Sequence, residues 1–245
     1  MRAFRFGWRE WTGALGDTGT LIPIFLGLVA VNGLPPARSL LLVGATYLAS
    51  AVLFRVPVPV QPLKAMGAIA IARGIPMPVL SAGAIWIGAI LLALVCTGTL
   101  GRLARWFPPT VVKGIQFGVG LMLLQAGVLL VLGERVVPAG YAGAATALPA
   151  PGDFLPALWF LAIPQLPLTL GNAVYASADA ARTYFADRAR RVTPGRLAAS
   201  IALANVAIGV CGGMPVCHGS GGMTAHVRFG ARTAGATVIA GSLCL

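Results

Sequence analysis

The stretch "GGMPVCHGSGGMTAHVRFGART" (residues 212–233) combines glycines, a proline, two histidines and two arginines in an otherwise apolar chain. A second stretch, "VPVPVQPLKAMGAIAIARG" (residues 56–74), has the same organisation. Aligning Pro59 with Pro215 also pairs Val60 with Val216 and Gly74 with Gly230. Each stretch follows an ordinary apolar run, and each such run follows one that contains proline and polar residues. Interrupted segments at matching places in two halves of a membrane chain are typical of inverted repeats.

The composition places the chain in a membrane. Hydrophobic residues make up 58% of its 245 residues and charged residues only 10%, whereas soluble domains are nearer a quarter charged. Long apolar runs approach the ~20 residues that a helix needs to cross a bilayer; they occupy residues 11–34, 39–56, 79–100, 111–132, 154–178 and 197–212. The final run, residues 233–245, is shorter. The sequence therefore predicts an all-α polytopic membrane protein.

The positive charges predict the orientation. A formal net charge of +12 comes from 18 Lys and Arg residues against 6 acids, and most of the cations gather before the first run, around residues 102–113 and in residues 182–196. With each broken segment crossing once, all three groups fall on the side of the N-terminus. The positive-inside rule then places that terminus in the cytoplasm, in a bacterial inner membrane by default, without a cleaved signal peptide. Because the membrane topology accounts for the placement of these cations, no nucleic-acid partner is expected.

The two broken segments predict an anion site. Non-helical backbone is tolerated at membrane depth only inside protein or beside a cavity, so residues 57–61 and 213–217 should approach in extended form before a short helix starts. The first N–H groups of such a helix lack partners, and its dipole makes the end positive. Pro62 suits the first helical position, with Lys64 in the first turn. At the other start, glycines at 219, 221 and 222 leave the backbone open, and Ser220 and His218 add donors.

Simpler explanations exist for each feature. Lys64 could extend its amine to the interface, and His218 and His226 could be fully hydrogen-bonded core histidines, an explanation favoured for His226. The Gly114-x-x-x-Gly118 pattern predicts close helix packing. Cys211, Cys217 and the two histidines do not have the spacing of a zinc site. Neither a metal nor a cofactor is expected.

Four segments carry a family resemblance: "GDTGTLIPIFLGL" (16–28), "PVPVQPLKAMGAIA" (57–70), "PQLPLTLGNAV" (164–174) and "GGMPVCHGSGGMTAHVRFGARTAG" (212–235). In this order they closely resemble the signature segments of the molybdate transporter family, a branch of the sulfate permease superfamily. The resemblance implies two inverted seven-span repeats, arranged as a core domain that holds the substrate and a gate domain. It implies half-helices as the third and tenth spans, near residues 62–75 and 218–229, flanked by the first and eighth spans.

The resemblance also implies the site. The matching positions are Thr18, Thr20, Gln61, Lys64, Gln165, Asn172, His218, Gly219, Ser220 and Gly221. Relative to the family, two spans before the eighth and several after the tenth are missing, which leaves an incomplete gate. The expected division is a first repeat at 1–133, an external loop at 134–153 and a partial second repeat at 154–245.

The function expected from these features is secondary active transport of molybdate, with sulfate or tungstate as less favoured substrates. Asp17 and Asp179 are the candidates for proton coupling, because ionisable groups within a membrane are functional candidates by default. A nucleobase substrate is disfavoured because neither half-helix start contains a carboxylate. A non-transporting membrane subunit that pairs with another chain stays an alternative, and so does a homo-oligomer. No nucleophile and base pair suggests an enzyme.

Overall fold

The computed structural model describes residues 3–133 and 148–245. Six stretches are long and apolar enough to cross a membrane: Trp8–Asn32, Pro36–Phe54, Met77–Cys96, Pro109–Val131, Pro151–Arg191 and Pro194–Cys211. They match the six predicted runs. The protein is an integral membrane protein, and the predicted all-α architecture with two half-helices is confirmed.

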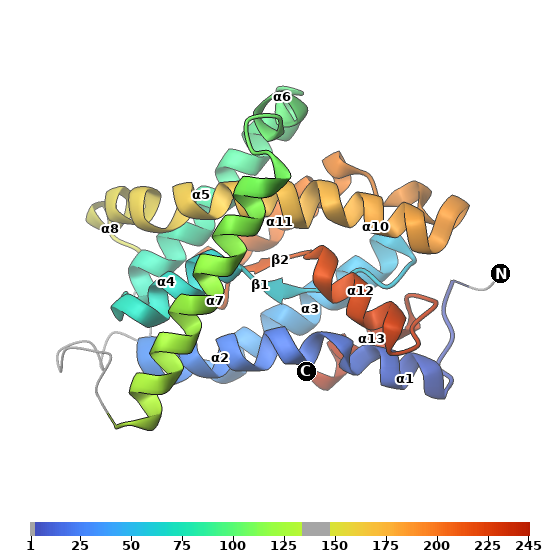
Figure 1. Ribbon diagram of the computed structural model, residues 1–245, viewed down its shortest axis with the longest axis horizontal. Helices are drawn as coiled ribbons and strands as arrows, with labels where there is room; N and C mark the ends of the chain where they lie inside the picture. The colour runs from blue at the N-terminus through green and yellow to red at the C-terminus, as the bar shows by residue number, and fades with distance from the viewer. Residues whose placement is uncertain (1–2, 134–147) are drawn as a thin grey trace.

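Two long composite spans frame the molecule (Figure 1). The first contains α1 (Trp8–Ala14), the 3-10 turn η1 (Leu15–Asp17) and α2 (Thr18–Asn32). The second contains α8 (Pro151–Ala157), the π-helical turn η2 (Leu158–Ala162), α9 (Ile163–Leu168), the π-helical turn η3 (Thr169–Tyr175) and α10 (Ala176–Phe185), followed by the 3-10 turn η4 (Ala186–Arg191). In Figure 1 these two spans run along opposite edges in opposite chain directions.

Between these spans lies a two-stranded antiparallel sheet. The strand β1 (Gln61–Pro62) pairs with β2 (Val216–Cys217), with Gln61 opposite Cys217. The helix α4 (Lys64–Arg73) starts directly after β1, and α12 (Ser220–Arg228) starts directly after β2. Figure 1 shows the two short helices leading away from the strand pair toward opposite ends of the molecule. Both N-termini therefore lie together near the centre.

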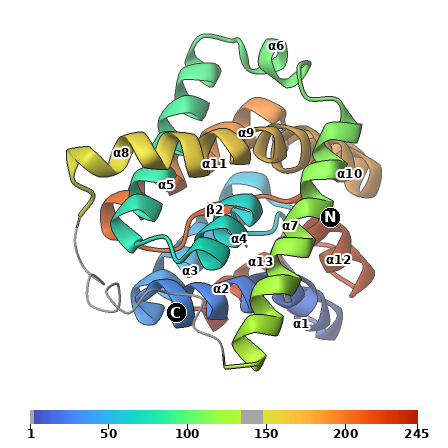
Figure 2. The same cartoon turned by 60° about the vertical axis from the view of Figure 1, so that its left-hand side comes forward.

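The remaining helices of each half pack against helices of the other half. Helix α11 (Pro194–Cys211) packs against α5 (Met77–Cys96), and α13 (Gly235–Leu243) packs against α3 (Pro36–Phe54). Each helix that precedes a strand thus packs against the helix that follows the other half-helix, as two inverted repeats require. Apolar side chains from both halves share one buried core. Helix α6 (Leu100–Ala104) leads into α7 (Pro109–Val131), which crosses over α4 and whose surface is mostly exposed (Figure 2).

Several local expectations were wrong. Pro62 lies in β1, and α4 begins at Lys64, so the proline does not occupy the first helical position. The extended segment continues because the Leu63 N–H donates to the Pro215 carbonyl at 2.9 Å. A Cβ built on Gly114 or Gly118 meets no atom of the described residues within 4 Å, so close helix packing is not the role of these glycines.

The predicted division into repeats and loop stays a prediction. Most of the expected external loop, residues 134–147, lies outside the described residues. Its last part does not form a loop, because α8 already begins at Pro151.

Candidate functional site

The starts of α4 and α12 bring five of the predicted site residues together. We call Gln61, Lys64, Asn172, Gly219 and Ser220 the half-helix cluster. A Cβ built on Gly219 would collide with Gln61 Oε1 and would lie 2.9 Å from Lys64 Nζ and 3.2 Å from Asn172 Nδ2. The Ser220 hydroxyl donates to Asn172 Oδ1 at 2.8 Å. Polar groups from β1, α4, η3 and α12 therefore converge on one point.

The backbone at this point is left open for a ligand. Neither Leu63, the N-cap of α4, nor Gly219, the N-cap of α12, supplies a side-chain cap. The first N–H groups of a helix then depend on a ligand or solvent, and they carry the positive end of the dipole. Glycine at 219 is required by the close approach of the surrounding side chains. The geometry suits an anion that contacts both helix ends at once.

Lys64 brings a positive charge to the cluster. It is the first residue of α4, where a cation is normally unfavourable beside the helix dipole. Its Nζ donates to Gln61 Oε1, and the Gln61 Nε2 group donates to Asp17 Oδ1. Asp17 is buried, and its Oδ2 also accepts a 2.9 Å hydrogen bond from the Tyr47 hydroxyl. The Gln61 amide thus lies between the Lys64 amine and the Asp17 carboxylate and is hydrogen-bonded to both.

The eighth span reaches the cluster through its irregular turns. The Gln165 Oε1 accepts from the Met66 N–H at 3.0 Å and so caps the first turn of α4, while its Nε2 donates to Thr169. Asn172 lies in the π-helical turn η3. Such turns are frequent at functional sites because they turn a side chain out of the regular helical register. Pro164 and Pro167 precede this turn and are the sequence signal for the irregularity.

His218 lies beside the cluster with both ring nitrogens occupied. Its Nδ1 lies 2.7 Å from the Pro59 carbonyl and its Nε2 lies 3.0 Å from the Ser200 hydroxyl. Because the carbonyl can only accept, Nδ1 carries the proton and Nε2 accepts from Ser200. The Ser177 hydroxyl donates to the His218 carbonyl. The histidine ring therefore holds the two extended segments together, and the structure gives it no free nitrogen to direct at a ligand.

The remaining predicted residues are Thr18, Thr20, Gly221 and Asp179. Thr18 Oγ1 donates to the Leu15 carbonyl in its own turn, at 2.7 Å. Within residues 3–133 and 148–245, no hydrogen bond joins Thr18 or Thr20 to the cluster. Gly221 is exposed, and a Cβ there would meet open space. Asp179 is also exposed, on α10.

His226 makes a contact that the sequence did not indicate. This side chain is fully buried, and its Nδ1 bonds the Gly13 carbonyl at 2.7 Å. Its Nε2 has no hydrogen-bond partner among the described residues and lies 3.8 Å from Asp17 Oδ2. The explanation favoured for His226, a fully hydrogen-bonded core histidine, is therefore wrong and fits His218 instead. No local sequence signal marks a contact between residues so far apart in the chain.

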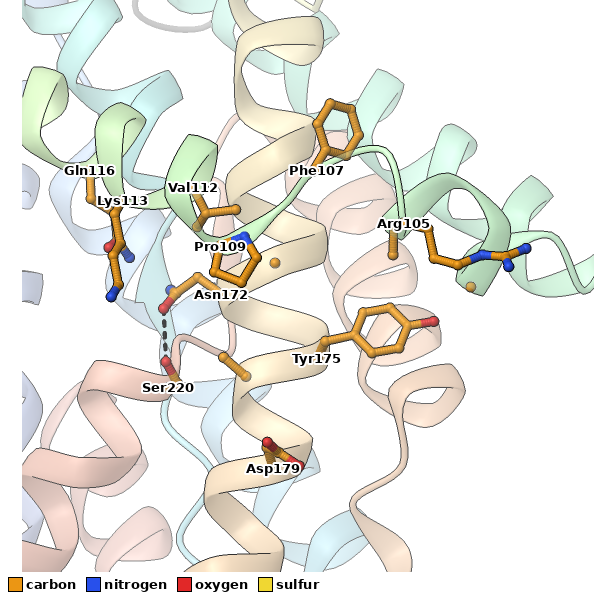
Figure 3. A pocket seen from close by; sticks show the side chains of 14 residues that line it. Arg105, Phe107, Pro109, Val112, Lys113, Gln116, Asn172, Tyr175, Asp179 and Ser220 are labelled. Carbon is orange, nitrogen blue, oxygen red and sulfur yellow. Dashed lines mark hydrogen bonds between the residues drawn. The ribbon is translucent and has the colours of Figure 1, made fainter.

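A pocket of about 640 Å³ leads to the cluster from one side. It lies between α7 on one wall and η3 and α10 on the other, and Asn172 and Ser220 form part of its lining (Figure 3). Lys113 and Arg105 supply cations to its wall, and Asp179 supplies one carboxylate. Sequence reasoning treated both cations as topology signals only. The pocket gives the cluster a route to the outside of the protein.

Comparisons with known proteins show what this chain is similar to. A family model described as "Molybdate transporter of MFS superfamily" matches residues 9–123 and 157–245. Molybdate transporter 2 of Arabidopsis thaliana is 39% identical over 115 residues, which are 46% of this chain and 25% of that protein. Molybdate transporter 1 of Chlamydomonas reinhardtii is 34% identical over 134 residues, 51% of this chain and 25% of that protein. The matched part thus spans about a quarter of the length of these relatives.

A solved structure shows the fold. The transmembrane domain of a cyanobacterium bicarbonate transporter, BicA, has a TM-score of 0.64 and covers 97% of this chain and 80% of that chain, at 16% sequence identity. The likeness assigns the inverted-repeat fold of the sulfate permease type. Because the family model matches the chain in two long segments that contain all four signature stretches, the protein belongs to the molybdate transporter family.

Proposed function

We propose that the protein is a secondary active transporter of molybdate, which binds between the N-termini of α4 and α12. The observation that carries the proposal is the convergence of Lys64, Asn172, Ser220 and the Gly219 backbone on one point between two helix starts whose N-cap residues supply no side-chain cap. The printed names of the relatives, molybdate transporters of a plant and an alga, support the substrate.

The chemistry of the cluster fits a tetrahedral dianion. Lys64 contributes a full charge, and the two helix ends contribute partial charges and N–H groups. The Asn172 Nδ2 group is a further donor at the same place, and the Ser220 hydroxyl orients it by donating to Asn172 Oδ1. The nearest carboxylate, Asp17, already accepts from Tyr47 and Gln61. A nucleobase, whose ring N–H groups need free acceptors, therefore fits less well than an oxyanion.

The pocket beside α7 supplies the access route. Lys113 and Arg105 on its wall attract anions and raise their local concentration, an effect that falls with ionic strength. Arg102 and Arg105 belong to a basic group that the charge distribution assigns to the cytoplasm. The pocket then opens inward, in a cell membrane whose N-terminal side is cytoplasmic. Transport proceeds as the core, which holds the anion between α4 and α12, moves past the gate.

Uptake of molybdate into molybdate-starved bacteria tests this function. Cells that produce the parent chain should accumulate molybdate above cells with an empty vector. Lys64→Gln should lower the apparent affinity about 10- to 100-fold, since a hydrogen bond to a charged group contributes about 1.5–3 kcal/mol. Arg102→Gln, on the exposed helix α6 outside the pocket lining, is the matched loss of a cation and should retain uptake.

Excess unlabelled sulfate and tungstate define the substrate in the same assay. Molybdate transport predicts that sulfate competes weakly. Stronger competition by sulfate would assign the same site to sulfate. Absence of uptake by a correctly inserted parent chain would contradict transport by this chain.

A further inference from the structure

A fully buried histidine and a fully buried carboxylate face each other behind the half-helix cluster. His226 lies on α12 and Asp17 on η1, and both side chains are inaccessible to solvent. The His226 Nδ1 must carry a proton, because its partner at 2.7 Å is the Gly13 carbonyl, which can only accept. In the neutral ring the Nε2 atom is then an acceptor. It has no partner among the described residues and lies 3.8 Å from Asp17 Oδ2.

This arrangement is incomplete without a further proton. Two acceptors, a neutral imidazole nitrogen and a carboxylate oxygen, face each other in a buried place. Leaving such a buried group unpaired is unfavourable. A proton on Nε2 converts the contact into an ion pair between His226 and Asp17 and removes the mismatch. The pair therefore offers a place for one further proton.

The pair communicates with the anion site through Gln61. The Gln61 amide donates to Asp17 Oδ1 with Nε2 and accepts from Lys64 with Oε1. The backbone of α12 lies directly over this amide, since a Cβ on Gly222 would lie 2.5 Å from Asp17 Oδ1 and 2.6 Å from Gln61 Nε2. A change of charge at Asp17 thus reaches Lys64 through the two hydrogen bonds of the Gln61 amide.

The surrounding charges decide whether a proton bound at the pair strengthens or weakens anion binding. With His226 neutral, the negative charge of Asp17 balances the positive charge of Lys64. A proton gives the group a net charge of +1, which favours a dianion at the half-helix cluster. The other titratable or charged side chains on the elements packed around the pair are Arg9 and Glu10 on α1, Arg38 and Tyr47 on α3, Cys217 on β2, Asp179, Arg182 and Tyr184 on α10 and Arg228 on α12.

Several of these neighbours have other partners or are exposed, which leaves the Asp17–His226 pair as the group whose charge changes. Tyr47 donates to Asp17, and Glu10 accepts from the backbone of Arg232 and Thr233 at the far end of α12. Asp179 is exposed.

We propose that Asp17 and His226 form the proton-binding site of the transporter, and that one proton bound between them is taken up together with the oxyanion. This inference rests on the proposed function and names the coupling group of that same site. It selects Asp17 over Asp179 and adds His226, which acts as a positioning and proton-holding residue without touching the anion. Reciprocity follows from linkage: protonation strengthens anion binding by the factor by which the anion strengthens protonation.

The test is calorimetric binding of molybdate to the purified full chain at about pH 6 and about pH 8, on either side of the ordinary histidine pKa of about 6.5. The parent should bind more tightly at the lower pH, by up to about tenfold per pH unit, the limit for one linked proton. Measured in two buffers of different ionisation enthalpy, binding should take up about one proton. His226→Gln should bind molybdate with the same affinity at both values, and Asp179→Asn should keep the pH dependence of the parent.

The outcomes separate the two proposals. Binding by the parent without pH dependence or proton uptake overturns the coupling and leaves the proposed function standing. No binding at either pH overturns both. If His226→Gln keeps the pH dependence, or if Asp179→Asn loses it, the assignment to Asp17 and His226 is wrong. Where His226→Gln does not fold, the proton count of the parent and the pH profile of Asp17→Asn decide.

Discussion

Gln61 and Cys217 lie opposite each other where β1 pairs with β2. The alignment that matches Pro59 with Pro215 also matches Gln61 with Cys217, so the residues that face each other in the sheet occupy equivalent positions in the two segments. An approximate two-fold axis therefore passes between them. The same alignment matches Lys64 with Ser220, the first residues of α4 and α12. It places a cation at one helix start and a hydroxyl at the other, so the site is symmetric in backbone and asymmetric in chemistry.

The first prediction concerns the effect of a side chain at the crowded Gly219 position on molybdate affinity. Gly219→Ala places a Cβ against Gln61 Oε1 and close to Lys64 Nζ, which displaces the two groups from the helix starts. We expect molybdate affinity to fall at least about tenfold, a loss of about 1.4 kcal/mol. The same substitution at Gly221, where a Cβ meets open space, should change affinity by less than about threefold. Equal effects of the two variants in a binding titration would contradict the geometry of the cluster.

Asn205 makes the second prediction, which concerns stability. Its side chain accepts from the Val216 N–H at 2.9 Å and donates to the Val216 carbonyl at 2.7 Å, so α11 holds β2 in place. Asn205→Ala leaves two buried backbone groups unpaired, at about 1–3 kcal/mol each. The melting temperature in detergent should fall by about 4–24 °C. Leu203→Ala, on the exposed face of the same helix, is the control and should lower it by less than Asn205→Ala.

The third prediction concerns Lys113 and the access of molybdate to the half-helix cluster. It lines the pocket that leads to Asn172 and Ser220 but lies on α7, outside the half-helix cluster. Lys113→Gln should raise the KM for molybdate several-fold at low ionic strength, with little change in kcat, because the cation attracts the anion without holding it. The difference from the parent should shrink in high salt. A loss of kcat that persists in high salt would place Lys113 in the transport step itself.

The sequence predicted the half-helices of this site better than the hydrogen bonds between its side chains. Proline and glycine mark both half-helices because their backbone effects are local, and the starts at Lys64 and Ser220 lie within two residues of those expected. Pro62 was misplaced because the strand pairing, a contact across the chain, extends β1 to that residue. The links from Lys64 through Gln61 to Asp17 depend on side chains that meet only after folding. Hydrophobic patterning cannot register such contacts.

Tyr47 makes the last prediction, which tests the proton site from its other side. The Tyr47 hydroxyl donates to Asp17 Oδ2, the same oxygen that faces His226 Nε2. Once His226 Nε2 is protonated, it shares this oxygen with the Tyr47 hydroxyl, so Tyr47→Phe should make the pair hold its proton to higher pH. The midpoint of the pH dependence of molybdate binding should therefore rise. Tyr175→Phe, whose ring lines the pocket, should leave the midpoint unchanged. A midpoint that falls in Tyr47→Phe would mean that the hydroxyl does not compete with His226 for this oxygen, and the assignment of the proton to the contact between His226 and Asp17 would be wrong.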